Sequence, residues 1–256
     1  MKNLFRIAVS IAVVCCLVAA CASSHKVKPS RYNCSTKVAQ AIKKYQDEKY
    51  GAVKTILDDV KLQCAGHEVM DTAQYYLAMS LVRMKEYPEA KIEFMRLSQD
   101  FPQGPFYDEA MFRVGYCVFK SSRSPDRDQA ETGEAVKLFR DFLESNPSSP
   151  YADSVQKYLV IANDKLSQKE FENAIFYQKI GEKEAALVSY KTFIEEYPGS
   201  KFVPQAQLSR GQILMQLGRS AEAKETLEAL VASDKQGEFG KKAQELLSQL
   251  SKQIKE

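Results

Sequence analysis

The stretch Ala90–Ala110, AKIEFMRLSQDFPQGPFYDEA, occurs three times in this chain with the same spacing of its apolar residues. The other copies are Ala135–Val155, AVKLFRDFLESNPSSPYADSV, and Ala186–Ala206, ALVSYKTFIEEYPGSKFVPQA. In each copy an alanine is followed by large apolar residues four and seven positions later, which lie on one face of an α-helix. A proline twelve positions after the alanine ends that helix. An aromatic and a small residue then follow on the next helix, so the block predicts helix, turn, helix.

Two fainter copies, which lack the proline, begin at Val53 and Ala223. The five copies are separated by 37 to 51 residues, which is close to the period of tetratricopeptide repeats, each a pair of helices. A single pair leaves an apolar face uncovered, so the pairs must stack. The sequence therefore predicts an all-α domain over residues 34–256. We expect a right-handed superhelical stack of about five tetratricopeptide-type helix pairs.

The irregular spacings of the copies predict two departures from a uniform stack. Ser121–Gly133 is charged and contains proline, so we expect a long surface loop there. Tyr151–Ile180 contains no glycine or proline, which predicts one long helix ended by Gly181. The apolar periodicity after Phe239 predicts a last amphipathic helix that caps the stack.

Composition and motifs favour a binding protein over an enzyme. The chain has 256 residues, 45% of them hydrophobic, and its net charge of +3 is too small to indicate nucleic-acid binding. The only histidines are His25 and His67, and there is no metalloprotease, hydrolase or phosphate-loop motif. Asp126 and Asp128 lack the glycine and the bidentate glutamate of a calcium loop. We expect no catalysis, no cofactor and no metal.

The N-terminus predicts export and lipid anchoring. Lys2 and Arg6 precede an apolar run, Ile7–Val18, which is typical of a signal peptide and too short to span a bilayer. We therefore assign residues 1–20 to a signal peptide and residues 21–33 to a flexible tether. The small residues before Cys21 resemble the lipobox of bacterial lipoproteins. That resemblance implies a diacylglycerol on the Cys21 sulfur and a palmitate on the new N-terminus; the alternative is a secreted protein with a chance cysteine.

The lipobox, the five repeats, the aromatic–proline junctions and the loop in the third repeat together resemble the BamD family. The most specific segments are SPDRDQAE, FRDFLESNPSSPYADSV and FYQKIGEKEAALVSYKTFIEEYP, all within Ser124–Pro198, and the resemblance extends over the chain from Cys34. It implies a scaffold, anchored in the outer membrane and facing the periplasm, for assembly and insertion of β-barrel proteins. It further implies that the C-terminal repeats bind the barrel subunit through its POTRA domains and that the N-terminal repeats bind unfolded outer-membrane proteins.

One junction departs from the family pattern. Leu62–His67 reads LQCAGH, where the family carries an aromatic residue and proline. Cys34 opens the first expected helix and Cys64 ends its partner, so the two ends meet in an antiparallel pair. Because the periplasm is oxidising, we predict a Cys34–Cys64 disulfide that stabilises the fold by roughly 3 kcal/mol. Free thiols, or a metal site with His67, are the alternatives.

Two sets of residues are candidates for binding. Inward positions of the second and third repeats carry aromatic and methionine side chains suited to apolar client segments. These client-groove candidates are Tyr75, Met79, Phe112 and Tyr116, and the alternative is that they are core. For the barrel subunit we select the turn that contains Lys179, Gly181 and Lys183. A different tetratricopeptide lipoprotein, such as a pilotin for pilus or secretion assembly or a cell-envelope coordinator, is the alternative function.

Overall fold

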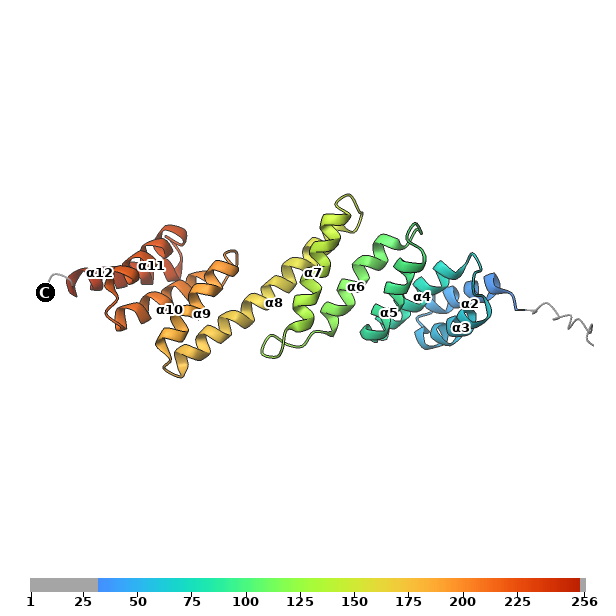
Figure 1. Cartoon of the computed structure of the whole chain (residues 1–256), viewed down its shortest axis with the longest axis horizontal. Helices are drawn as coiled ribbons and strands as arrows, with labels where there is room; N and C mark the ends of the chain where they lie inside the picture. Colours follow the sequence, from blue (N-terminus) through green and yellow to red (C-terminus); the bar gives the residue numbers. More distant parts are fainter. Residues whose placement is uncertain (1–31, 254–256) are drawn as a thin grey trace, which may run out of the picture.

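A computed structural model of the protein describes residues 32–253. The predicted signal peptide over residues 1–20, Cys21 and nearly all of the predicted tether lie outside the described residues. Within 32–253 the chain contains eleven α-helices and no strand. Figure 1 shows these helices following one another along the long axis, from α2 at one end to α12 at the other. The all-α repeat fold expected from the sequence is confirmed.

Five consecutive helix pairs and one final helix make up the stack. The helices are α2 (Cys34–Gln46), α3 (Tyr50–Gln63), α4 (Met70–Arg83), α5 (Tyr87–Asp100), α6 (Tyr107–Ser121), α7 (Ala130–Ser145), α8 (Ala152–Lys179), α9 (Lys183–Glu196), α10 (Val203–Gln216), α11 (Ser220–Ser233) and α12 (Glu238–Gln253). The three complete sequence blocks correspond to α5, α7 and α9 together with the start of the helix that follows each. The blocks therefore run from the second helix of one pair into the first helix of the next.

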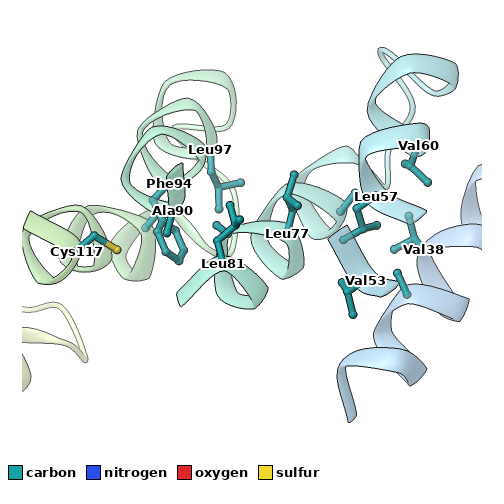
Figure 2. Packing of buried hydrophobic residues seen from close by; sticks show 14 of the residues in the cluster. Val38, Val53, Leu57, Val60, Leu77, Leu81, Ala90, Phe94, Leu97 and Cys117 are labelled. Carbon is teal, nitrogen blue, oxygen red and sulfur yellow. The ribbon is translucent and has the colours of Figure 1, made fainter. Parts of the chain in front are cut away.

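The apolar positions of the repeated block form the core. The alanine and the two large apolar residues that open each complete block are all at most 2% exposed; they are Ala90, Phe94, Leu97, Ala135, Phe139, Phe142, Ala186, Tyr190 and Phe193. Figure 2 shows the first three of these beside Leu81 and Leu77 of α4, while the valines of α2 and α3 lie farther along the same cluster. Cys117 lies in the same cluster as a buried free thiol, and burial raises its pKa to about 12. Burial of these side chains is what holds successive pairs together.

Small residues set how closely the helices of a pair approach. A Cβ atom added to Gly115 on α6 would lie 2.7 Å from Cε1 of Phe139 on α7. In the last pair, a Cβ atom on Gly211 of α10 would lie 2.6 Å from Cδ2 of Leu227 on α11. Both distances are shorter than van der Waals contact. Each glycine therefore makes room for a large side chain of the partner helix.

The long helix predicted from the absence of glycine and proline is α8. Gly181 follows it with a φ of +85°, a left-handed conformation that glycine adopts without strain. Val155 and Ala162, in the first half of α8, are buried in a cluster with α6 and α7. Phe171 and Ala174, in its second half, are buried in a separate cluster with α9 and α10. One continuous helix thus joins the two halves of the stack.

The loop in the third pair is shorter than Ser121–Gly133, the span expected from its composition. The loop covers residues 122–129, since α7 begins at Ala130 and includes Gly133. Buried Gln129 ends the loop: its amide nitrogen donates to the Ser124 carbonyl at 2.6 Å, and its oxygen accepts from the Thr132 hydroxyl at 2.7 Å. This side chain stabilises the start of α7, which lies three residues before Gly133.

The exceptional first junction is joined by a covalent bond. Cys34 is the first residue of α2 and Cys64 is the C-cap of α3, and the two form a disulfide with their Cα atoms 5.9 Å apart. Gly66 turns the chain toward α4 with a φ of +78°. The disulfide and this glycine occupy the place of the proline turn found in the three complete blocks.

Gly115→Ala tests the close approach of α6 and α7. The added methyl group forces the Phe139 ring to move, so we expect a loss of about 1–3 kcal/mol in the free energy of unfolding, measured by urea denaturation. Gly133→Ala is the matched control, because nothing lies within 4 Å of its Cβ position. Alanine is the better helix former, so the control gains up to about 1 kcal/mol. Equal effects at both sites would contradict the packing argument.

Replacing both Cys34 and Cys64 with alanine tests the disulfide. The linked chain has less conformational freedom when unfolded, so the double variant loses about 3 kcal/mol of stability. Thermal unfolding with and without a reducing agent measures the effect. The reductant must lower the melting temperature of the parent and leave that of the double variant unchanged. A parent that melts at the same temperature in both buffers would show that the bond contributes nothing.

Candidate functional site

Aromatic side chains from α4, α6 and the start of α8 gather around one acidic residue. Glu109 on α6 is only 9% exposed. Its Oε2 accepts hydrogen bonds from the hydroxyls of Tyr75 at 3.0 Å and Tyr151 at 2.9 Å. Its Oε1 accepts from Nε and Nη2 of Arg113 at 3.1 and 2.9 Å. We call Tyr75, Glu109, Arg113, Tyr116 and Tyr151 the tyrosine cluster.

The two tyrosine hydroxyls of the cluster are fixed donors. Burial, and then the charge of Glu109, raise the pKa of Tyr75 above its ordinary value. Burial and the hydrogen bond to Glu109 raise the pKa of Tyr151 to about 12. Both hydroxyls therefore keep their protons at neutral pH and donate to Glu109. Because the two tyrosines come from different repeats, this carboxylate connects the second and fourth helix pairs through the third.

The guanidinium group of Arg113 lies over two aromatic rings of this region. Its guanidinium carbon lies 5.4 Å from the ring centroid of Phe112 and 5.6 Å from that of Tyr116. The ion pair with Glu109 balances its charge, and the Arg113 side chain stays 23% exposed. The cluster thus presents aromatic rings and the edge of a neutralised guanidinium, a mixed surface suited to apolar segments.

The four client-groove candidates do not all lie on this surface. Tyr75, Met79 and Tyr116 are half-buried, and each is in contact with the core. Phe112 is 5% exposed and belongs to the core, so its assignment to a groove is wrong. The ring centroids of Tyr151, the N-cap of α8, and of Tyr158 in α8 lie 6.0 and 5.8 Å from the Phe112 ring centroid, and these rings cover it.

The turn chosen for the barrel subunit is fully on the surface. Lys179, Gly181 and Lys183 are all exposed at the junction of α8 and α9. Two apolar neighbours were not among the residues predicted from the sequence: Phe176 is 57% exposed and Ile180 is 54% exposed. The sequence could have indicated their exposure. Positions 176 and 180 are one helical turn apart, and they do not lie on the helix face that buries Phe171 and Ala174.

We call Phe176, Tyr177 and Ile180 the turn patch. The rings of Phe176 and Tyr177 contact each other edge to face, with centroids 5.7 Å apart. Arg219, after α10, bonds Glu184 of α9 at 3.1 Å and Glu222 of α11 at 2.7 Å. These bonds show that the turn of the last repeat lies beside the first turn of α9. Both carboxylates are exposed, so the pairs themselves stabilise this arrangement little.

The described residues offer no metal centre and no membrane span. Among residues 32–253, no three His, Cys, Asp or Glu side chains lie close enough together to hold a metal ion. None of the helices in this part of the chain is both long and apolar enough to cross a membrane. The surfaces that remain as candidate sites, the tyrosine cluster and the turn patch, are suited to binding other chains.

Glu109→Ala tests the carboxylate at the centre of the cluster. Its loss leaves Arg113 and two tyrosine hydroxyls without their acceptor, so we expect about 3 kcal/mol of destabilisation in urea denaturation. Asp58→Ala is the control, because the Lys54–Asp58 pair is 42% and 46% exposed and is worth at most about 0.5 kcal/mol. Adding Arg113→Met to Glu109→Ala should recover part of the loss. Equal losses in the two single variants would refute a central role for Glu109.

Comparisons with known proteins agree on one family for this chain. Residues 35–230 match the family YfiO, described as outer membrane lipoprotein. A relative from Caulobacter vibrioides named outer membrane protein assembly factor BamD is 28% identical over 139 residues, covering 54% of this chain and 46% of that protein. A relative of the same name from Neisseria meningitidis serogroup A is 25% identical over 171 residues, covering 63% and 62%. The chain thus spans about half to two-thirds of the length of these relatives.

Solved structures with a similar arrangement are distant. A tetratricopeptide-repeat protein from Thermus thermophilus has a TM-score of 0.37 and 13% sequence identity, covering 85% of this chain and 98% of that one. This likeness carries no argument about function.

Proposed function

This chain belongs to the YfiO family of outer membrane lipoproteins, and we propose that it is a non-enzymatic scaffold for assembling β-barrel proteins into the outer membrane. The names of its relatives support this proposal, since both are called outer membrane protein assembly factor. In this proposal the lipid on Cys21 holds the protein on the periplasmic face of the membrane. The helical stack then carries separate surfaces for the barrel subunit and for its unfolded clients.

The turn patch is the proposed contact for the POTRA domains of the barrel subunit. The observation that carries this assignment is the exposure of Phe176 and Ile180 at 57% and 54%. Exposed aromatic and aliphatic side chains that adjoin one another are typical anchors of protein interfaces. Lys179 and Lys183 flank the patch and suit acidic groups at the rim of a partner.

The tyrosine cluster is the proposed contact for unfolded outer-membrane proteins. Tyr75 and Tyr116 are half-buried, and the Tyr75 hydroxyl is occupied by Glu109. Met79 adds a flexible apolar side chain, which adapts to different sequences. Such a surface favours apolar and aromatic segments over charged ones. This selectivity fits clients whose alternate residues face lipid in the finished barrel.

A Phe176→Ser, Ile180→Ser double variant tests the partner surface. Loss of two anchors should reduce the recovery of a POTRA-bearing barrel protein in a mild-detergent pull-down by at least about tenfold. Since both side chains are exposed, the melting temperature should not fall.

Val160→Ser is the matched control, because Val160 is also an exposed apolar residue of α8, at 50% exposure, but lies far from the turn. The control should recover the barrel protein as the parent does. Undiminished recovery by the double variant would reject the turn patch. If the parent recovers no barrel protein but a secretion or pilus component instead, the assembly function itself is wrong.

A further inference from the structure

The long helix α8 repeats a helix-packing position that is covered in the other pairs. Gly115 lies 25 residues after Ala90, which opens the first complete block. Gly211 lies at the same distance after Ala186, which opens the third. Each glycine packs against the second helix of its own pair, α7 or α11. The corresponding residue of the middle block is Val160 on α8, and it is 50% exposed.

The second helix of the fourth pair covers a different part of α8. Ala174, which lies 14 residues after Val160, is buried in a cluster with Ala186 and Tyr190 of α9. A separation of two heptads keeps Ala174 and Val160 on nearly the same face of the helix. Figure 1 shows α9 beside the second half of α8 and α7 beside the first half. Among residues 32–253, the first half of α8 therefore has no second helix of its own.

A hollow of about 490 Å³ adjoins this uncovered face. It is lined by residues of α7, by Asp164 and Ser167 of α8, and by the turn 196–200 between α9 and α10. Val160, Asp164 and Ser167 share one face of α8, because they are spaced by four and three residues. The turn closes this face at one end, where the Ser200 hydroxyl donates to the Ser167 hydroxyl at 3.1 Å. Toward Val160 the face is open to solvent.

Ion pairs connect the earlier second helices in series. Lys61 of α3 bonds Glu93 of α5 at 2.8 Å, and Lys91 of α5 bonds Glu134 of α7 at 2.6 Å. Arg140, on the side of α7 that lines the hollow, is exposed and forms no ion pair within residues 32–253. A helix that carried a carboxylate beside Arg140 would continue the series.

The side chain of Val160 restricts which helix can pack here. In the third and fifth pairs, glycine at this position leaves room for a large side chain, Phe139 or Leu227. Valine fills part of that room. An incoming helix therefore needs a small residue opposite Val160, so that a large and a small residue still meet, with their places exchanged.

We propose that the first half of α8 binds an amphipathic α-helix of a partner protein in the position of a second helix. That helix carries alanine or glycine opposite Val160, an acidic residue opposite Arg140 and a basic residue near Asp164 and Glu196, which also line the hollow. The site uses neither the turn patch nor the tyrosine cluster. Failure of this proposal would therefore leave the proposed function standing, and failure of that function would leave this site standing.

Two labelled peptides test the fit against Val160. The probe has the α5 sequence YPEAKIEFMRLSQD with Phe94→Ala, and the matched probe keeps Phe94. A lactam between side chains introduced at positions 92 and 96, both exposed in α5, keeps these short peptides helical. Fluorescence anisotropy with the purified full-length protein in detergent gives each Kd. The alanine peptide should bind at least about tenfold more tightly, because the phenylalanine ring collides with Val160.

Val160→Gly should reverse this preference, because glycine leaves room for the ring. Tighter binding of the phenylalanine peptide cannot result from unfolding of the variant. Val188→Gly is the control, since Val188 is an exposed valine of α9, at 65% exposure, and this variant should keep the preference of the parent. No binding of the alanine peptide by the parent, an unchanged preference in Val160→Gly, or a reversal in Val188→Gly would each overturn the proposal.

A charge exchange tests the role of Arg140. Arg140→Glu should weaken binding of the alanine peptide about tenfold, because it places two carboxylates together. A second change in that peptide, Glu93→Lys, should restore binding to Arg140→Glu and weaken binding to the parent. Equal affinity of Arg140→Glu and the parent for the alanine peptide would contradict the proposed orientation of the helix and overturn the proposal.

Discussion

The contact between a small residue on one helix and a large side chain on its partner is the constraint on which the rest of the structure depends. Where Gly115 meets Phe139, and where Gly211 meets Leu227, no side chain larger than hydrogen fits. These contacts bring the helices of a pair close enough to bury the large residues of the block. The buried faces then fix how the next pair stacks, and stacking determines which side chains remain on the surface.

The sequence predicted the core well because burial there follows from periodicity within one helix. Phe94 and Phe139 each lie four residues after the alanine that opens their block. Because the same spacing recurs in all three complete blocks, an error in the assumed helix face would have conflicted with all three. The exposure of Phe112 could not be read in the same way, since it depends on Tyr151 and Tyr158 arriving from a helix some forty residues later. The start of α7 was misplaced for a related reason: composition marks a loop, but the hydrogen bonds of Gln129 end it.

The tyrosine cluster and the turn patch use aromatic residues in opposite ways. In the cluster, hydroxyls and a guanidinium surround Glu109, so nearly every polar group already has a partner within the chain. Such a surface is rigid, and it offers ring faces without unmet hydrogen bonds. In the turn patch, Phe176 and Ile180 are exposed and surrounded by lysines. If a partner protein covered this apolar area, its removal from water would be favourable. The turn patch is therefore better suited than the tyrosine cluster to a stable interface.

Both surfaces include a residue at one end of α8, and the length of this helix sets their separation. Tyr151 caps the start of the helix and contributes to the tyrosine cluster, while Phe176 lies near its end in the turn patch. At 1.5 Å per residue the two positions are about 38 Å apart along a single helix. The first half of α8 is buried against α6 and α7 and the second half against α9, so neither end moves without disturbing a packed cluster. A client bound at one end and a barrel subunit bound at the other would therefore be held at a fixed distance, which is the physical property that a scaffold requires.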